Sequence, residues 1–114
     1  MTEETTAKTT SIRKLNDDLR TGKSHDGQIM ITAGINEMGA AFKSEVAKAM
    51  AEFDAFTSDN DPHLEHDFGA LEVQGHKVFF KFDYYDLTMK MLSPDPSDPM
   101  VTKRVLTIML AEEY

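Results

Sequence analysis

Apolar side chains recur at helical spacing in two stretches of this 114-residue chain. In the first stretch, Ile12, Leu15 and Leu19 are separated by charged residues, which predicts a short amphipathic helix. We expect it to begin at Ser11 and to end near Gly22. The second stripe predicts one continuous helix of about five turns that packs against a sheet. Its members, spaced by three or four positions, are Ile35, Met38, Phe42, Val46, Ala49, Phe53 and Phe56.

Strand patterns occupy most of the remaining chain. The apolar run 28–32 lies between two glycines and predicts a short strand. Residues 66–73 and 76–85 predict two strands joined by a two-residue turn at Gln74-Gly75. Residues 102–111 are apolar on both faces, which is typical of a central strand. Three prolines in residues 93–99 exclude that segment from a sheet interior, so we expect a stiff surface loop there.

The two-residue turn also fixes which residues face each other across the hairpin. Paired residue numbers sum to 149, so Glu72 should oppose Lys77 and His66 should oppose Asp83, both charge-complementary pairs. One face should meet the long helix, and the other should be covered by the first helix or by a partner chain. The first face collects Leu71, Val73, Val78, Phe80, Phe82 and Tyr84. The second collects His66, Phe68, Ala70, Glu72, Lys77, Phe79, Lys81, Asp83 and Tyr85.

These elements, in the order α-β-α-β-β-β, predict an α+β fold. We expect a small, mostly antiparallel sheet of about four strands, with one long and one short helix on one side. Residues 1–10 have little apolar surface to bury and are predicted to be a disordered tail. Residues 11–114 are predicted to form a single domain, because the chain is too short for two ordinary ones.

Composition and charge limit the location and chemistry of the protein. The chain lacks cysteine, which excludes disulfides and thiolate zinc sites and fits a reducing compartment. There is no apolar run of roughly 20 residues and no signal-like start, so we expect a cytoplasmic protein without a membrane contact. The net charge is −8, and residues 26–75 hold ten acidic and only two basic residues. Such a surface repels nucleic acid and favours basic partners.

One polar cluster offers candidate chemistry. Glu65, His66 and Asp67, with Asp83 opposite, could bind a divalent metal in a hydrolase or nuclease. His66 could also act as an acid/base group oriented by Asp83, with Lys81, Tyr85 and Asp86 nearby. His63 and Glu65 match the H-x-E of zinc deaminases, but the cysteines of that motif are missing. Phosphate-binding glycine loops and dinucleotide fingerprints are also missing, so we predict no cofactor. The alternative is that these are solvated loop residues with a structural role.

Several motifs together resemble a known group of sequences. They are residues 15–20 (LNDDLR), 60–62 (NDP), 65–69 (EHDFG), 81–86 (KFDYYD), 93–99 (SPDPSDP) and 104–114 (RVLTIMLAEEY). From about Leu15 onward the chain is similar to a family of uncharacterised proteobacterial proteins, often labelled plasmid-related, with a domain of unknown function. Where the family more usually has a Tyr-Gly-like pair, this chain has His63 and Leu64. The resemblance implies a setting in mobile elements and no specific mechanism.

Charge, size and this resemblance favour a non-enzymatic binding protein. We expect its acidic surface to occupy a basic site on a protein partner, for example a nucleic-acid-binding defence effector, as an anti-restriction or anti-CRISPR inhibitor that mimics DNA. Two alternatives are a metal-dependent hydrolase using Glu65, His66, Asp67 and Asp83, and a homodimeric module joined through Phe68, Phe79 and Tyr85. The predicted partner-binding residues are Glu52, Asp54, Asp59, Asp61, Glu65, Asp67, Asp83, Asp86, Asp95 and Asp98.

Overall fold

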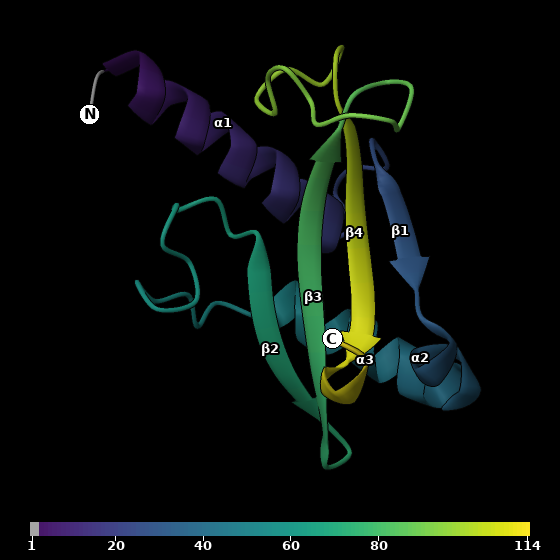
Figure 1. The fold of residues 1–114 in the computed structure, drawn as a ribbon. Helices are drawn as coiled ribbons and strands as arrows, with labels where there is room; N and C mark the ends of the chain where they lie inside the picture. The colour runs from purple at the N-terminus through teal and green to yellow at the C-terminus, as the bar shows by residue number, and fades with distance from the viewer. Residues whose placement is uncertain (1–2) are drawn as a thin grey trace.

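A single four-stranded sheet with helices behind it makes up the structure, a computed structural model that describes residues 3–114 (Figure 1). The strand order is β1-β4-β3-β2; β1 runs parallel to β4, and the other neighbours are antiparallel. The predicted α+β class and mostly antiparallel sheet are therefore confirmed. The elements are α1 (Glu3–Arg20), β1 (Gln28–Ile31), α2 (Ala33–Glu37), α3 (Ala40–Glu52), β2 (Phe68–Val73), β3 (His76–Tyr85), β4 (Lys103–Leu110) and the 3-10 turn η1 (Ala111–Glu113).

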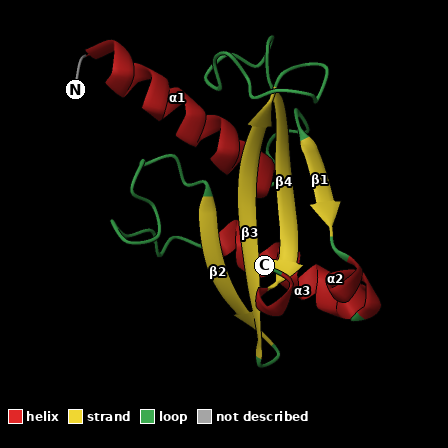
Figure 2. Cartoon of the chain, in the orientation of Figure 1, coloured by secondary structure: helices red, strands yellow, loops and turns green. Residues whose placement is uncertain are grey.

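The core lies between α1 and α3 and one face of the sheet. Figure 2 shows both helices behind the strands, while the face turned to the viewer carries only the short turn η1, at the end of β4. Phe42 and Val46 of α3 are almost completely buried against Val78 and Phe80 of β3. Burial of apolar area on this scale is the main force that holds such a two-layer fold together. The predicted inner face of the hairpin is correct: Leu71, Val73, Val78, Phe80 and Phe82 are buried, and Tyr84 packs against them.

The hairpin between β2 and β3 has the predicted register over its whole length. Val73 pairs with His76 and Glu72 with Lys77, so partner numbers sum to 149 as expected. The strand begins at Phe68, however, and His66 adopts a φ of 54°, which is not an extended conformation. The predicted pairing of His66 with Asp83 is therefore wrong, because the chain leaves the sheet before it reaches His66.

The long helix predicted between Ile35 and Phe56 is divided into two helices. Gly39 lies between α2 and α3 with a φ of 93°, a conformation that glycine tolerates best and that ends one helix before the next begins. Helix α3 ends at Glu52, earlier than predicted. Phe53 and Phe56 still pack on the core from the following loop, with the Phe53 ring centroid 5.5 Å from that of Phe80.

Helix α1 begins well before the predicted Ser11. Residues 3–10, expected to be a disordered tail, form its first turns, and Met1 and Thr2 lie outside the described residues. No glycine or proline interrupts residues 3–20, and Lys8 lies 3.8 Å from Asp95 of the proline-rich loop. Across residues 3–114, none of the helices combines the length and apolar character that crossing a membrane requires.

Gly69 provides a test of the packing between β2 and β3. A Cβ atom at this position would overlap the Phe80 ring and approach Phe53. We expect Gly69→Ala to lower the free energy of unfolding by about 1–3 kcal/mol, the usual cost of overpacking a core. Urea unfolding followed by circular dichroism measures this loss. The neighbouring exposed change Ala70→Ser should stay within about 0.5 kcal/mol of wild type. Equal unfolding midpoints for Gly69→Ala and wild type would contradict this packing.

Candidate functional site

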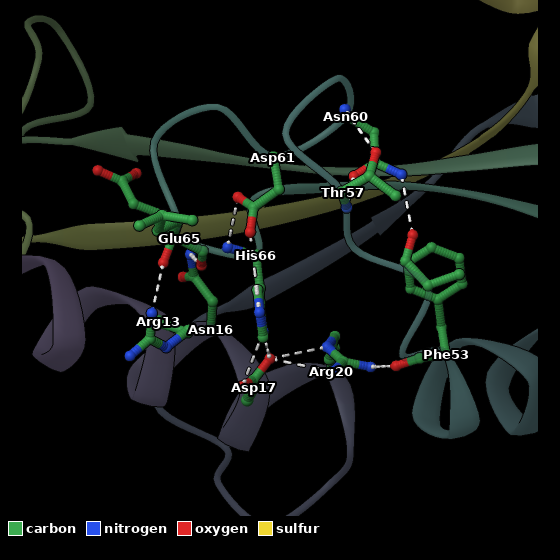
Figure 3. Close-up of polar contacts among 12 residues, drawn as sticks. Arg13, Asn16, Asp17, Arg20, Phe53, Thr57, Asn60, Asp61, Glu65 and His66 are labelled. Atoms are coloured by element: carbon green, nitrogen blue, oxygen red, sulfur yellow. Dashed lines mark hydrogen bonds and ion pairs between the residues drawn. The ribbon is translucent and has the colours of Figure 1, made fainter.

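His66 belongs to the loop that joins α3 to β2, and its ring lies between the carboxylates of Asp17 and Asp61 (Figure 3). Its ring Nδ1 lies 2.9 Å from Oδ1 of Asp17, and its Nε2 lies 3.7 Å from Oδ2 of Asp61. Its backbone N–H donates to Asp61 at 3.0 Å, and its ring stacks on Phe56 with centroids 3.7 Å apart. The ring nitrogens thus face Asp17 and Asp61, whereas the sequence predicted Asp83 as the partner of His66. Asp17, from α1, could not be identified as a neighbour because it lies 49 positions away in the chain.

Asn16 is the centre of a second polar network and is completely buried. Its Nδ2 donates to the Glu65 carbonyl at 3.0 Å and to the Tyr84 hydroxyl at 2.8 Å. Its Oδ1 accepts a 2.7 Å hydrogen bond from Nε of Arg104, while Tyr84 donates to the Glu65 carboxylate at 2.9 Å. Arg104 also donates to the Pro96 carbonyl. One side chain of α1 therefore joins the 53–67 loop, β3, β4 and, through Arg104, the proline-rich loop.

Arg20, at the end of α1, binds the end of α3. Its Nη1 donates to the carbonyls of Met50 and Phe53 at 2.8 and 2.9 Å, at the end of a helix, where the last carbonyls lack their usual helical partners. Its Nε donates to Asp17 at 3.0 Å, so Asp17 serves both Arg20 and His66. Within the described part of the chain, every buried side-chain nitrogen and oxygen has a hydrogen-bond partner. The network is thus fully satisfied and has the character of a structural clamp.

Two carboxyl groups beside this network, those of Glu65 and Asp67, have a raised pKa. Burial raises the pKa of Glu65, although the hydrogen bond from Tyr84 opposes part of this shift. Burial also raises the pKa of Asp67, and the nearby charge of Asp61 adds to the effect. Burial likewise raises the pKa of the Tyr84 hydroxyl. These shifts follow from removing charged forms from water, which structural as well as catalytic groups experience.

The metal-site hypothesis finds no geometric support in residues 3–114. No group of three or more His, Asp or Glu side chains there is arranged to hold a metal ion. Asp83, the fourth predicted ligand, lies on the face turned away from α1 and α3 and accepts a 2.8 Å hydrogen bond from Lys81. The two ring nitrogens of His66 already contact the carboxylates of Asp17 and Asp61. Glu65 and His66 therefore belong to the structural network, whereas Asp83 belongs to an ion pair on the sheet.

The ten predicted partner-binding carboxylates fall into groups with different roles. Glu52, Asp54 and Asp59 are exposed at the end of α3 and in the loop after it. Asp61 is buried, and Glu65, Asp67 and Asp83 are half-buried. The remaining three cap turns between β3 and β4: Asp86 accepts from Thr88, Asp95 from Ser97 and Asp98 from Met100. These hydrogen bonds lower the pKa of Asp86 and of Asp95.

The side of the sheet that faces away from α1 and α3 contains a hollow with a volume of about 550 Å³. We call this surface the open face. Helix α1 lies on the opposite side, with the core, so the predicted cover by the first helix is wrong. The Lys81–Asp83 ion pair lies in an otherwise largely apolar hollow. Its lining also includes Met30, Tyr85, Met89, Val105 and Thr107, drawn from β1, β3, β4 and the loop after β3.

Aromatic and apolar side chains extend the open face on two sides. Toward β2, the rings of Phe68, Phe79 and Tyr114 pack together, with centroids 5.1 to 6.3 Å apart. Beyond the other end of β3, the connection to β4 exposes several large apolar side chains. Exposed apolar patches of this kind mark sites of protein interaction, and methionine adapts readily to a partner's shape. The exposed residues are Leu87, Met89, Met91, Leu92 and Met100.

Comparison with known proteins identifies the family but not an activity. The family described as "Protein of unknown function (DUF3768)" matches residues 31–113. The chain belongs to this DUF3768 family. The matched span runs from the end of β1 through η1, so it includes most of the open face and the 53–67 loop, whereas α1 lies outside it. No curated protein and no solved structure matches the chain significantly. The association with plasmids remains a prediction.

Replacing Asn16 tests the structural clamp. Asn16→Leu leaves the buried Arg104 Nε, the Tyr84 hydroxyl and the Glu65 carbonyl each without one partner. We expect the free energy of unfolding to fall by about 2–4 kcal/mol, since a buried unpaired polar group costs about 1–3 kcal/mol. Lys14→Ala, at an exposed position of the same helix, should change it by less than about 0.5 kcal/mol. Unfolding in urea measures both, and a near-neutral Asn16→Leu would show that the clamp contributes little.

The raised pKa of Glu65 predicts a pH-dependent difference between wild type and Glu65→Gln. A carboxyl whose pKa is higher in the folded state destabilises folding as it ionises, so this cost is present at neutral pH and disappears as pH falls toward its unfolded pKa of about 4.3. Glutamine keeps an acceptor for Tyr84 but does not ionise. We therefore expect Glu65→Gln to gain stability relative to wild type as pH rises from about 4.5 to 7. Unfolding curves at both pH values measure this, and the opposite trend would contradict the burial of Glu65.

Proposed function

We propose that this DUF3768 protein is a non-enzymatic binding protein whose open face receives a segment of a partner protein. The observation that carries the proposal is the 550 Å³ hollow on a sheet face that neither α1 nor α3 covers. Small binding sites are typically concave and mostly apolar, with a few polar groups that orient the ligand. The Lys81–Asp83 pair supplies such groups, and Tyr85, Met89 and Val105 supply apolar walls.

The arrangement of the titratable groups supports binding over catalysis. A general base needs a nitrogen or oxygen free to accept a substrate proton. Asp17 and Asp61 flank the ring of His66, and Glu65 accepts a hydrogen bond from Tyr84. These groups stabilise the 53–67 loop against α1, and none of them lines the hollow.

Charge favours a basic partner. The chain carries −8, and exposed carboxylates at Glu52, Asp54 and Asp59 create a negative field that speeds encounter with a positive surface. A partner that has an apolar segment for the hollow and a separate basic surface for these carboxylates fits both features. The finer form of this proposal is that the partner is a nucleic-acid-binding defence protein and that the chain is its mobile-element-encoded inhibitor. Asp61, Asp86, Asp95 and Asp98 already stabilise turns, so the exposed three are the better candidates for that contact.

Filling the hollow should abolish partner capture. Thr107 is half-buried in the lining of the hollow, and Thr107→Trp would occupy much of that space. We expect the tagged wild type to retain a stoichiometric protein from nuclease-treated lysate and Thr107→Trp to retain at least about tenfold less, a loss near 1.4 kcal/mol. Ser44→Trp adds the same side chain to the exposed surface of α3 and should bind like wild type. Equal capture by Thr107→Trp would contradict the proposed site.

The same capture experiment can separate the contribution of surface charge to partner binding from that of the hollow. Glu52→Gln, Asp54→Asn and Asp59→Asn combined should weaken retention at low salt and lose this effect at high salt, because exposed charges are screened. A control with the same change in net charge combines Glu37→Gln, Glu45→Gln and Glu112→Gln, all at exposed positions elsewhere. If both triple variants weaken capture equally, only net charge contributes to binding, and the proposal that Glu52, Asp54 and Asp59 contact the partner is contradicted.

A further inference from the structure

Strand β1 forms an edge of the sheet, and its outward backbone groups are available for pairing. The N–H of Thr32 donates to the Ile108 carbonyl of β4 at 3.1 Å. Because hydrogen-bonding direction alternates along a strand, the N–H and C=O groups of Ile29 and Ile31 point away from β4. The C-terminal end of β1 is fixed further by Glu113, whose carboxylate accepts from the Thr32 hydroxyl at 2.6 Å and from the Gly34 N–H at 3.0 Å. The edge is therefore ordered by its attachments to β4 and η1.

This edge lacks the features that normally prevent strands from joining. Natural sheets protect edges with charged side chains, proline, bulges or a covering segment. Residues 27–36 contain no charged side chain and no proline, in a chain of net charge −8. Ile29, Met30 and Ile31 are 48%, 46% and 45% exposed. An ordered, neutral and apolar edge of this kind is a template for another strand.

We propose that β1 pairs antiparallel with β1 of a second copy of this chain, about a twofold axis at Met30. In that register, Ile29 faces Ile31 of the second copy, and Met30 faces its own equivalent. Ile29 and Ile31 carry the outward backbone groups, so each of the two Ile29–Ile31 pairs exchanges two hydrogen bonds. Isoleucine then meets isoleucine on one face of the joined sheet, and methionine meets methionine on the other.

The neutrality of β1 in a strongly acidic chain fits a second copy of this chain as the occupant. Two chains of net charge −8 repel each other over most of their surfaces, so they can meet closely only where the contact itself is neutral. The β1 segment itself carries no charge, and the one carboxylate bound at its end, that of Glu113, is held by Thr32, Gly34 and Leu110. The opposite edge strand, β2, carries the exposed Glu72 and follows Asp67. The axis at Met30 runs perpendicular to the sheet, so both open faces point the same way. The dimer thus presents two hollows side by side, a bivalent form of the proposed binding surface.

A charge swap at Met30 tests both the interface and its register. Sedimentation velocity over a range of concentrations should show wild type in monomer–dimer equilibrium. Met30→Lys and Met30→Glu should each raise the dimer dissociation constant at least tenfold, because like charges would face each other across the axis. An equimolar mixture of the two variants should restore the dimer. Met91→Lys and Met91→Glu place the same charges on an exposed loop methionine and should dimerise like wild type.

Three results would overturn the proposal. One is a wild type that stays monomeric at millimolar concentration. A second is a dimer that survives both single Met30 variants, which would assign it to another surface, such as the one around Phe68 and Phe79. The third is a mixture that stays monomeric, which would exclude the Met30 axis. Sedimentation of purified protein involves no other partner, so a monomer that still captures a protein through the hollow leaves the proposed function intact.

Discussion

The hydrogen bonds of Asn16 hold helix α1 to the sheet and to the loop before β2. A buried amide with three protein partners is stable only when all three are present, because each broken hydrogen bond leaves a polar group in an apolar environment. Through these bonds α1 is fixed to β3 and β4, and the loop before β2 is fixed to α1. Arg20 and Asp17 continue the same clamp to the end of α3. The inner side of the sheet is thereby closed.

The clamp explains why the outer side of the sheet is the available surface. Helices α1 and α3 pack on the inner side, and the side chains of His66 and Glu65 form hydrogen bonds there. The open face retains a hollow, an ion pair and aromatic side chains such as Phe79 and Tyr85. The inner side, whose buried polar groups are all hydrogen-bonded, stabilises the fold. The outer side still exposes apolar area, and burying that area against a partner would lower the free energy of the complex.

The sequence was sufficient where the determinants are local. The Gln74-Gly75 turn fixes a two-residue loop, and that loop determines every pair down to Phe68 and Lys81. The alternation of Val78, Phe80 and Phe82 likewise identified the buried face. The break at Gly39 could not be inferred from the apolar spacing, because α2 and α3 keep nearly the same spacing across it. A glycine in a helical pattern was the available signal.

The candidate site was harder to predict because its contacts are between distant residues. His66 was assigned to Asp83 by extending a strand that in fact begins at Phe68, and its real partner, Asp17, is on another element. The carboxylates that cap turns, such as Asp86 and Asp98, could have been recognised from the Thr, Ser and Pro residues around them. The hollow depends on residues from β1 and β4 that no local pattern brings together.

The most direct test of the central claim is a fragment screen by NMR on isotope-labelled protein, with small apolar and aromatic compounds as probes. The account predicts that shifts on titration concentrate on the open face, at Met30, Val105, Thr107 and the Met89 methyl group. Resonances of His66 and Glu65 should remain in place. Shifts centred on His66 and Glu65 instead would mean that the clamp is itself a ligand site, and the assignment of binding to the open face would be wrong.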